Sequence, residues 1–132
     1  MQRLARLIFR LRVLLLLSGL LLASASAGAG EADVVDVRVR LAGQRLYDFH
    51  VMVLSNDEGE VAFADRFEVL TRKGALLGVL ELERPEGEEE SQPYLREIRG
   101  VVVPPDITEV IVRARHHPTG YGGQTMVVRL PD

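Results

Sequence analysis

The chain has 132 residues, of which 47% are hydrophobic and 27% are charged, and its formal net charge is −3. This length allows one domain, or one domain with a tail. The near balance of charge argues against a protein that binds nucleic acid through phosphate attraction. Because the sequence contains no cysteine, disulfides, thiolate metal sites and thiol nucleophiles are excluded.

The first thirty residues have the pattern of a secretory signal peptide. Four arginines lie among the first twelve residues, whereas every acidic residue lies at Glu31 or later. An apolar run at 13–22 and a stretch of small residues at 23–30 follow. A basic start, a short apolar segment and a small-residue cleavage stretch are the three parts of a signal peptide. We therefore assign 1–27 to a signal peptide, 28–33 to a short linker and 34–131 to a folded domain.

An uncleaved membrane anchor is the alternative for this segment. A membrane-spanning helix needs about 20 apolar residues, and the strongly apolar run here has ten. A signal peptide could be cleaved near Ala25, Ala27 or Ala29, and the sequence fits these three sites equally well. No cysteine follows the apolar run to carry a lipid. From Gly28 onward twelve basic and 19 acidic residues remain, a net charge of −7. We expect a periplasmic or secreted protein without a stable membrane span after cleavage.

The rest of the chain is predicted to form short strands separated by turns. Apolar and polar residues alternate with a period of two, which is typical of half-buried strands. Turn-forming residues such as 55–59, 73–74 and 104–106 lie between them. The predicted strands, in chain order, are 35–41, 46–54, 61–71, 75–83, 94–103, 108–115 and 125–130.

Two of these strands carry more detailed predictions. In the strand at 46–54, alternation places Tyr47, Phe49, Val51 and Val53 on one face and leaves His50 on the other. In the strand at 75–83, Gly78 interrupts the apolar pattern, which indicates a bulge or a close approach of another backbone.

About seven short strands without an amphipathic helix predict an all-β fold. We expect an antiparallel β-sandwich that is immunoglobulin-like or fibronectin-like in general form. The segments between strands are too short for crossover helices, which excludes a parallel βαβ architecture. A small closed barrel is the structural alternative.

Three histidines are the candidate metal ligands. His116 and His117 precede a glycine-rich loop, and His50 lies on the polar face of an early strand. Imidazole nitrogens bind copper and zinc, so a site of His50, His116 and His117 with a carboxylate is one hypothesis. Adjacent side chains on an extended backbone point to opposite faces. The competing interpretation is therefore one exposed histidine and one packed against the loop.

The acidic residues offer weaker candidates. Six glutamates lie between Glu81 and Glu90, but their spacing lacks the interleaved Asp, Asn and Gly of calcium loops. A solvated loop is the preferred interpretation. Carboxylates such as Asp65 with Glu68, or Asp106 with Glu109, form no recognisable hydrolytic pair, and no nucleophile or phosphate-binding motif is present. We therefore expect no enzyme and no cofactor, and a binding module whose partner is a protein or small ligand outside the cytoplasm.

Two apolar triplets could instead mark an interaction surface. Residues 101–103 and 110–112 are apolar on both faces, so one face could meet a partner or another copy of the chain. A central strand that is covered on both sides explains the same pattern.

Four stretches of the sequence resemble a family of small secreted or periplasmic domains of unknown function. They are Ala64-Asp-Arg-Phe-Glu-Val69, Gly74-Ala-Leu-Leu-Gly78, Ser91-Gln-Pro-Tyr94, and Val112-Arg-Ala114 through Gly120-Tyr-Gly-Gly123. The resemblance covers about 61–130 and implies an extracytoplasmic β-sandwich. Where the family has two loop histidines, this chain has Arg84 and Glu86, which puts in doubt any metal role of that loop. The resemblance implies no activity.

Overall fold

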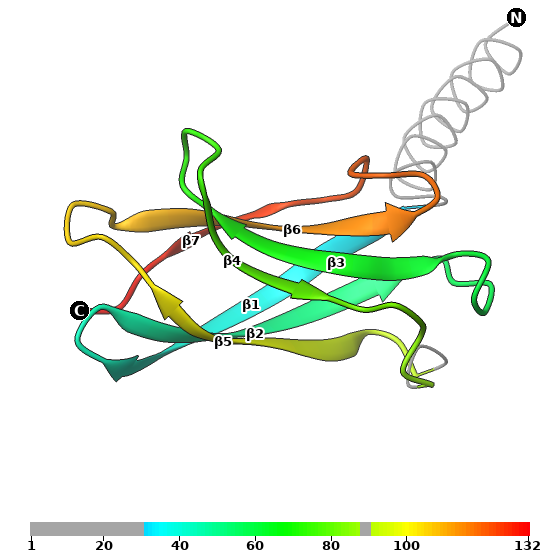
Figure 1. Cartoon of the computed structure of the whole chain (residues 1–132), viewed down its shortest axis with the longest axis horizontal. Helices are drawn as coiled ribbons and strands as arrows, with labels where there is room; N and C mark the ends of the chain where they lie inside the picture. The colour runs from blue at the N-terminus through cyan, green and yellow to red at the C-terminus, as the bar shows by residue number, and fades with distance from the viewer. Residues whose placement is uncertain (1–30, 88–90) are drawn as a thin grey trace, which may run out of the picture.

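A computed structural model describes residues 31–87 and 91–132 and shows a β-sandwich (Figure 1). The segment 1–27 that the sequence assigns to a signal peptide lies outside these residues, as do Glu88, Glu89 and Glu90. The seven strands are β1 (Ala32–Gly43), β2 (Leu46–Ser55), β3 (Phe63–Leu70), β4 (Leu76–Glu81), β5 (Tyr94–Val102), β6 (Glu109–His117) and β7 (Met126–Arg129). Within the two described ranges, no helix is long and apolar enough to cross a membrane.

The strands form two antiparallel sheets, which confirms the predicted fold class. The three-stranded sheet has the order β1-β2-β5, and the four-stranded sheet has the order β4-β3-β6-β7. Each predicted strand corresponds to one observed strand. β1 begins at Ala32, inside the stretch that the sequence assigns to a linker, and Ala32 is itself buried in the core.

The core lies between the sheets because alternate residues of each strand face inward. On β2 the inward residues are Tyr47, Phe49, Val51 and Val53, as alternation predicts. Phe67 and Val69 of β3, Val101 of β5, and Val110 and Val112 of β6 meet them from the other strands. A fold without disulfides depends on this apolar burial for its stability.

Two glycines allow the chain to pack closely. A Cβ atom at Gly78 would lie 2.7 Å from Cγ2 of Val101, so the predicted close approach is confirmed. A Cβ atom at Gly123 would lie 1.8 Å from the carbonyl oxygen of Ala32. Beside this contact the amide of Val34 donates to the carbonyl of Gln124 over 2.9 Å. The start of β1 is therefore joined to the segment that precedes β7.

Candidate functional site

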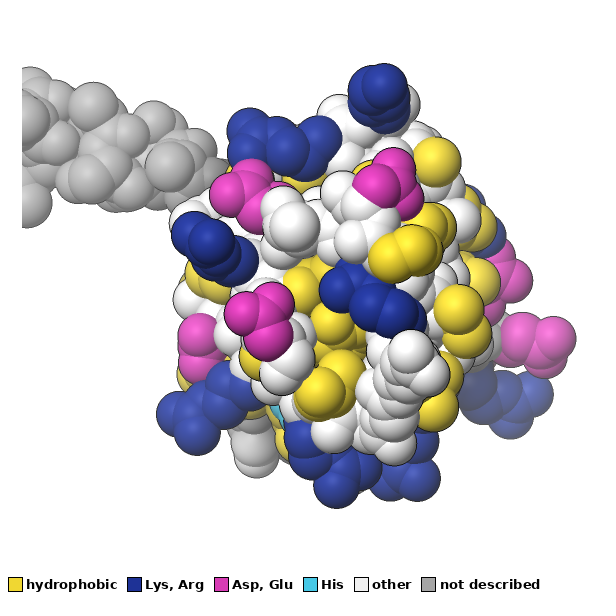
Figure 2. Space-filling view, turned by 90° about the vertical axis from the view of Figure 1, so that its left-hand side faces the viewer, with side chains coloured by type: hydrophobic (Ala, Val, Ile, Leu, Met, Phe, Trp, Pro, Cys, Tyr) yellow, Lys and Arg dark blue, Asp and Glu magenta, His cyan; other side chains and the backbone are white. Residues whose placement is uncertain are grey.

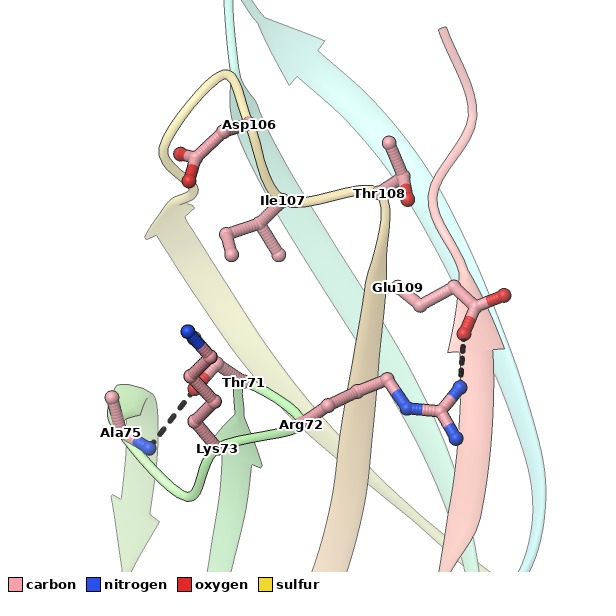
Figure 3. Close-up of a pocket in the computed structure, with 8 residues that line it drawn as sticks. All are labelled: Thr71, Arg72, Lys73, Ala75, Asp106, Ile107, Thr108 and Glu109. Atoms are coloured by element: carbon pink, nitrogen blue, oxygen red, sulfur yellow. Dashed lines mark hydrogen bonds and ion pairs between the residues drawn. The ribbon is translucent and has the colours of Figure 1, made fainter.

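A pocket lies at the end of the sandwich where β3 turns into β4 and where β5 passes to β6 (Figure 1). Its volume is about 400 Å³. Seen from this end, hydrophobic side chains lie in a hollow among basic and acidic ones (Figure 2). The lining residues are Thr71, Arg72, Lys73, Ala75, Asp106, Ile107, Thr108 and Glu109 (Figure 3).

The β3–β4 turn forms one wall and is fixed by its own hydrogen bonds. The amide of Thr71 donates to the carbonyl of Ala75 over 2.8 Å, and the Thr71 hydroxyl accepts from the amide of Ala75 over 3.0 Å. Gly74 has a φ of 88°, a conformation that favours glycine. This tight turn places Arg72 and Lys73 at the rim of the pocket.

The β5–β6 loop forms the other wall and is held by Arg45 from the β1–β2 turn. The Arg45 guanidinium donates to the carbonyls of Val103 at 3.1 Å, Pro104 at 2.7 Å and Ile107 at 2.5 Å. The amide of Ile107 also donates to the Pro104 carbonyl over 3.0 Å. These bonds set the position of Ile107 between the two walls (Figure 3).

Four charged side chains line the pocket: two form an ion pair with each other, and two are unpaired. Arg72 and Glu109 form an ion pair across the side of the pocket (Figure 3). Lys73 and Asp106 have no hydrogen bond or ion pair with any other described residue. The pocket therefore offers a free ammonium group from one loop and a free carboxylate from the other, with Ile107 and Ala75 as apolar contacts.

The pattern of predicted strands does not reveal this site, but one residue of the sequence points to it. Lys73 is the single lysine of the chain, beside fifteen arginines. The sequence pattern predicts turns at 73–74 and 104–106, and Asp106 and Glu109 stand out in it only as two carboxylates without a recognisable hydrolytic role. Nothing in the sequence shows that two turns about thirty residues apart meet, because their meeting depends on the pairing of the strands.

The three candidate metal ligands lie in different parts of the sandwich. His50 is on the outer face of the three-stranded sheet, where its Nε2 lies 3.3 Å from Oε1 of Glu97. His116 is buried in the other sheet, with Nδ1 2.8 Å from the Thr119 hydroxyl and Nε2 2.9 Å from the Asn56 carbonyl.

His117 is exposed and lies beside the ring of Phe63, with ring centroids 6.1 Å apart. The structure therefore does not bring His50 together with His116 and His117. In the part of the chain that the structure describes, no three His, Cys, Asp or Glu side chains are placed to hold one metal ion.

The other acidic candidates mostly face arginines. Oδ1 of Asp65 lies 3.0 Å from Nε of Arg115. Glu81 pairs with Arg66. Glu86, at one of the positions where the resembled family has a histidine, lies 3.8 Å from Nη1 of the buried Arg96. These carboxylates hold arginines in place and form no pair suited to hydrolysis.

Glu68 lies at the centre of a larger charge cluster on the outer face of the four-stranded sheet. Its carboxylate accepts from Nε of Arg113 over 2.8 Å, and Nε of Arg66 lies 3.3 Å away. Arg113 is stacked 4.0 Å from the ring centre of Tyr121. Burial raises the pKa of Glu68, but hydrogen bonds from Arg113 and Tyr121 and the positive charge of Arg113 outweigh it, so the net pKa lies below its ordinary value.

The two apolar triplets are mostly explained by the core. Val101, Val103, Val110 and Val112 are buried. Ile111 lies half-buried on the outer face between its neighbours Leu70 and Val127. Val102 is 67% exposed. The core therefore accounts for the four buried valines, but neither strand is covered on both sides: β5 is an edge strand with Val102 exposed, and Ile111 on β6 is half-buried.

The described residues form an all-β domain with a loop-built cavity at one end. A "Putative lipoprotein" of Halomicrobium mukohataei is 40% identical to the chain over 98 residues, which are 74% of this chain and 47% of the relative. The chain thus spans about half the length of the curated relative that it matches. No protein-family model matches the sequence. No solved structure matches it either.

Proposed function

We propose that the protein is an exported, non-enzymatic binding module that takes up a small ligand in the pocket at the end of its β-sandwich. The pocket itself is the observation that carries this proposal. It combines apolar contacts with unpaired polar groups on loops that hydrogen bonds hold in position, which is the usual composition of ligand sites. The ligand is met outside the cytoplasm.

Two independent features support the extracytoplasmic location. The N-terminal segment has the three parts of a signal peptide, and the name of the relative describes a lipoprotein. A lipid attached to a cysteine requires that residue, and these 132 residues contain none. We therefore propose a periplasmic or secreted protein, in agreement with the resemblance to small domains of that location.

The fold supports the finer assignment to the immunoglobulin-like or fibronectin-like sandwiches. Sheets of three and four strands with the orders β1-β2-β5 and β4-β3-β6-β7 agree with that class. Such sandwiches carry their loops at the two ends, where ligand sites can form. The proposed ligand site lies at one of these ends.

Binding fits the pocket better than catalysis does. Thr71 and Thr108 supply its hydroxyl groups, and the Thr71 hydroxyl already accepts the amide of Ala75. No histidine lines the pocket, and Glu109 is paired with Arg72. Copper or zinc binding by His50, His116 and His117 gains no support from their separate positions.

Export can be tested by expressing the full chain and fractionating the cells. We expect the protein in the extracytoplasmic fraction, with an N-terminus between residues 26 and 30 by mass spectrometry. A cytoplasmic protein with an intact N-terminus would overturn the proposed location.

Binding can be tested on the exported protein with a library of small metabolites, by following backbone amide signals in NMR spectra. We expect ligands to shift the signals of 71–75 and 104–109. The variant Ala75→Trp should abolish these shifts, because Ala75 is an exposed lining residue whose enlargement fills the pocket. Val61→Trp, at a 73% exposed position at the opposite end of the sandwich, should leave them unchanged. Shifts that survive Ala75→Trp, or no shifts in either loop, would contradict the proposal.

A further inference from the structure

The free charges of the pocket come from opposite walls. Lys73 lies on the β3–β4 turn and Asp106 on the β5–β6 loop, and the side chain of Ile107 projects from the β5–β6 loop toward the turn (Figure 3). The remaining charges of the lining, Arg72 and Glu109, neutralise each other. A ligand in this pocket therefore meets one positive and one negative group across an apolar surface.

Lys73 differs from the other basic groups of the molecule. Most of the described arginines lie within ion-pair distance of a carboxylate, for example Arg40 with Asp48, Arg99 with Glu97, and Arg115 with Asp65. The single lysine has no such partner among the described residues. An ammonium group is a compact charge on a flexible stem, able to follow a carboxylate that a small ligand presents.

Building on the proposed function, we propose that the pocket binds a small zwitterion, namely a free amino acid or a short peptide. Its carboxylate lies beside Lys73 and its ammonium group beside Asp106. Its apolar side chain packs against Ile107 and Ala75. The volume of about 400 Å³ is within the range of small-ligand pockets, which runs from roughly 300 to 1,000 Å³.

Charge complementarity favours this class over simple ions. A purely anionic ligand that pairs with Lys73 also meets the carboxylate of Asp106, and a purely cationic ligand meets the ammonium group of Lys73. Like charges brought together in a binding site oppose binding. A zwitterion forms one ion pair with Lys73 and one with Asp106, and it leaves the ion pair of Arg72 and Glu109 intact.

The test uses leucyl-leucine and three blocked forms of it as probes on the exported protein. The blocked forms are the N-acetyl dipeptide, the dipeptide amide and the doubly blocked molecule. Reductive methylation with ¹³C-formaldehyde keeps the charge of lysine and labels Lys73 as the sole lysine signal, beside that of the N-terminal amine. We expect leucyl-leucine to shift the Lys73 signal, each singly blocked form to bind roughly two- to fivefold more weakly, as for exposed ion pairs, and the doubly blocked form to bind more weakly than either.

Variants assign each charge to its partner. Lys73→Met should weaken leucyl-leucine roughly two- to fivefold but should not weaken the cationic dipeptide amide, for which it removes a like charge, whereas Lys73→Arg should restore part of the loss. Asp106→Asn should weaken leucyl-leucine to the same degree but should not weaken the anionic N-acetyl form. Arg38→Met removes an 87% exposed cation from the outer face of the other sheet and should change nothing.

The outcomes separate this inference from the proposed function. Suppose that library ligands shift the amide signals of 71–75 and 104–109, but that the four dipeptide forms bind equally or not at all. The proposal of a zwitterionic ligand is then wrong, and the proposal of a binding module is retained. If no ligand shifts either loop, both proposals are wrong.

Discussion

Glu68 is a carboxylate that remains charged although it is 3% exposed. It lies on the outer face of a sheet, where alternation predicts a solvated side chain. Arg66, Arg113 and Tyr121 cover it instead, and Tyr121 comes from the loop after β6. The alternation of β3 predicts the face of Glu68, but its burial depends on a loop about fifty residues away and was not predictable.

This arrangement makes stability depend on pH. The folded pKa of Glu68 lies below the ordinary value of 4.5, so its carboxylate stabilises the fold above that pH. The contribution is lost as the pH falls through the lowered pKa. We expect Glu68→Gln to lower the free energy of unfolding by about 2 to 3 kcal/mol at pH 7, because it leaves two arginines without their anion.

Urea denaturation at pH 7 and at pH 3 measures this effect, and the difference between the variant and the native protein should shrink at the lower pH. Asp36→Asn, at an exposed position of β1, is the control and should change stability by less than about 0.5 kcal/mol. An equal loss from Glu68→Gln at both pH values would show that packing, and not charge, is responsible.

At the level of elements, sequence alternation predicts the strands well. The strand predicted at 46–54 is observed as Leu46–Ser55, and the one predicted at 94–103 as Tyr94–Val102. The start of β1 is less predictable, because Ala32 and Val34 are buried in the core and their backbone contacts the segment at 123–124, far away in sequence. The pocket was missed for the same reason, since loops meet only after the sheets form.

The contact between Gly123 and the start of β1 gives a prediction for these elements. Gly123→Ala places a Cβ atom against the backbone oxygen of Ala32, so the two segments must move apart. We expect the free energy of unfolding to fall by about 2 to 4 kcal/mol. Gly43→Ala is the matched control, because its Cβ atom would have ordinary contacts of 3.4 Å with Leu46. Thermal or urea unfolding measures both, and equal effects would contradict the prediction.

At the level of the whole molecule, the chain crosses between the sheets where β5 passes to β6, and Arg45 holds this crossing. Its hydrogen bonds join a turn of one sheet to the connection that enters the other. Arg45 also donates to the hydroxyl of Tyr47, which in turn donates to the carbonyl of Pro131 near the C-terminus. One side chain thus fixes three segments at the pocket end.

Arg45→Gly removes these bonds without straining the backbone, since Arg45 has a φ of 55° that glycine adopts freely. We expect a loss of about 2 to 3 kcal/mol in unfolding free energy and faster amide hydrogen exchange at 104–108. Arg38→Ala removes an exposed arginine of β1. It should alter neither the free energy of unfolding nor the hydrogen exchange at 104–108. Unchanged exchange in 104–108 would show that the loop holds its position without Arg45.

The strand directions place the start of β1 and the C-terminus at opposite ends of the sandwich. β1 begins at the end of the sandwich opposite to the pocket, and the C-terminus lies at the pocket end (Figure 1). A tether through residues that precede β1 would therefore point the binding loops away from the surface that holds the protein. A tether or fusion at the C-terminus would crowd them against it. Immobilisation through the chain start is thus the orientation in which a sensor surface would leave the ligand site open.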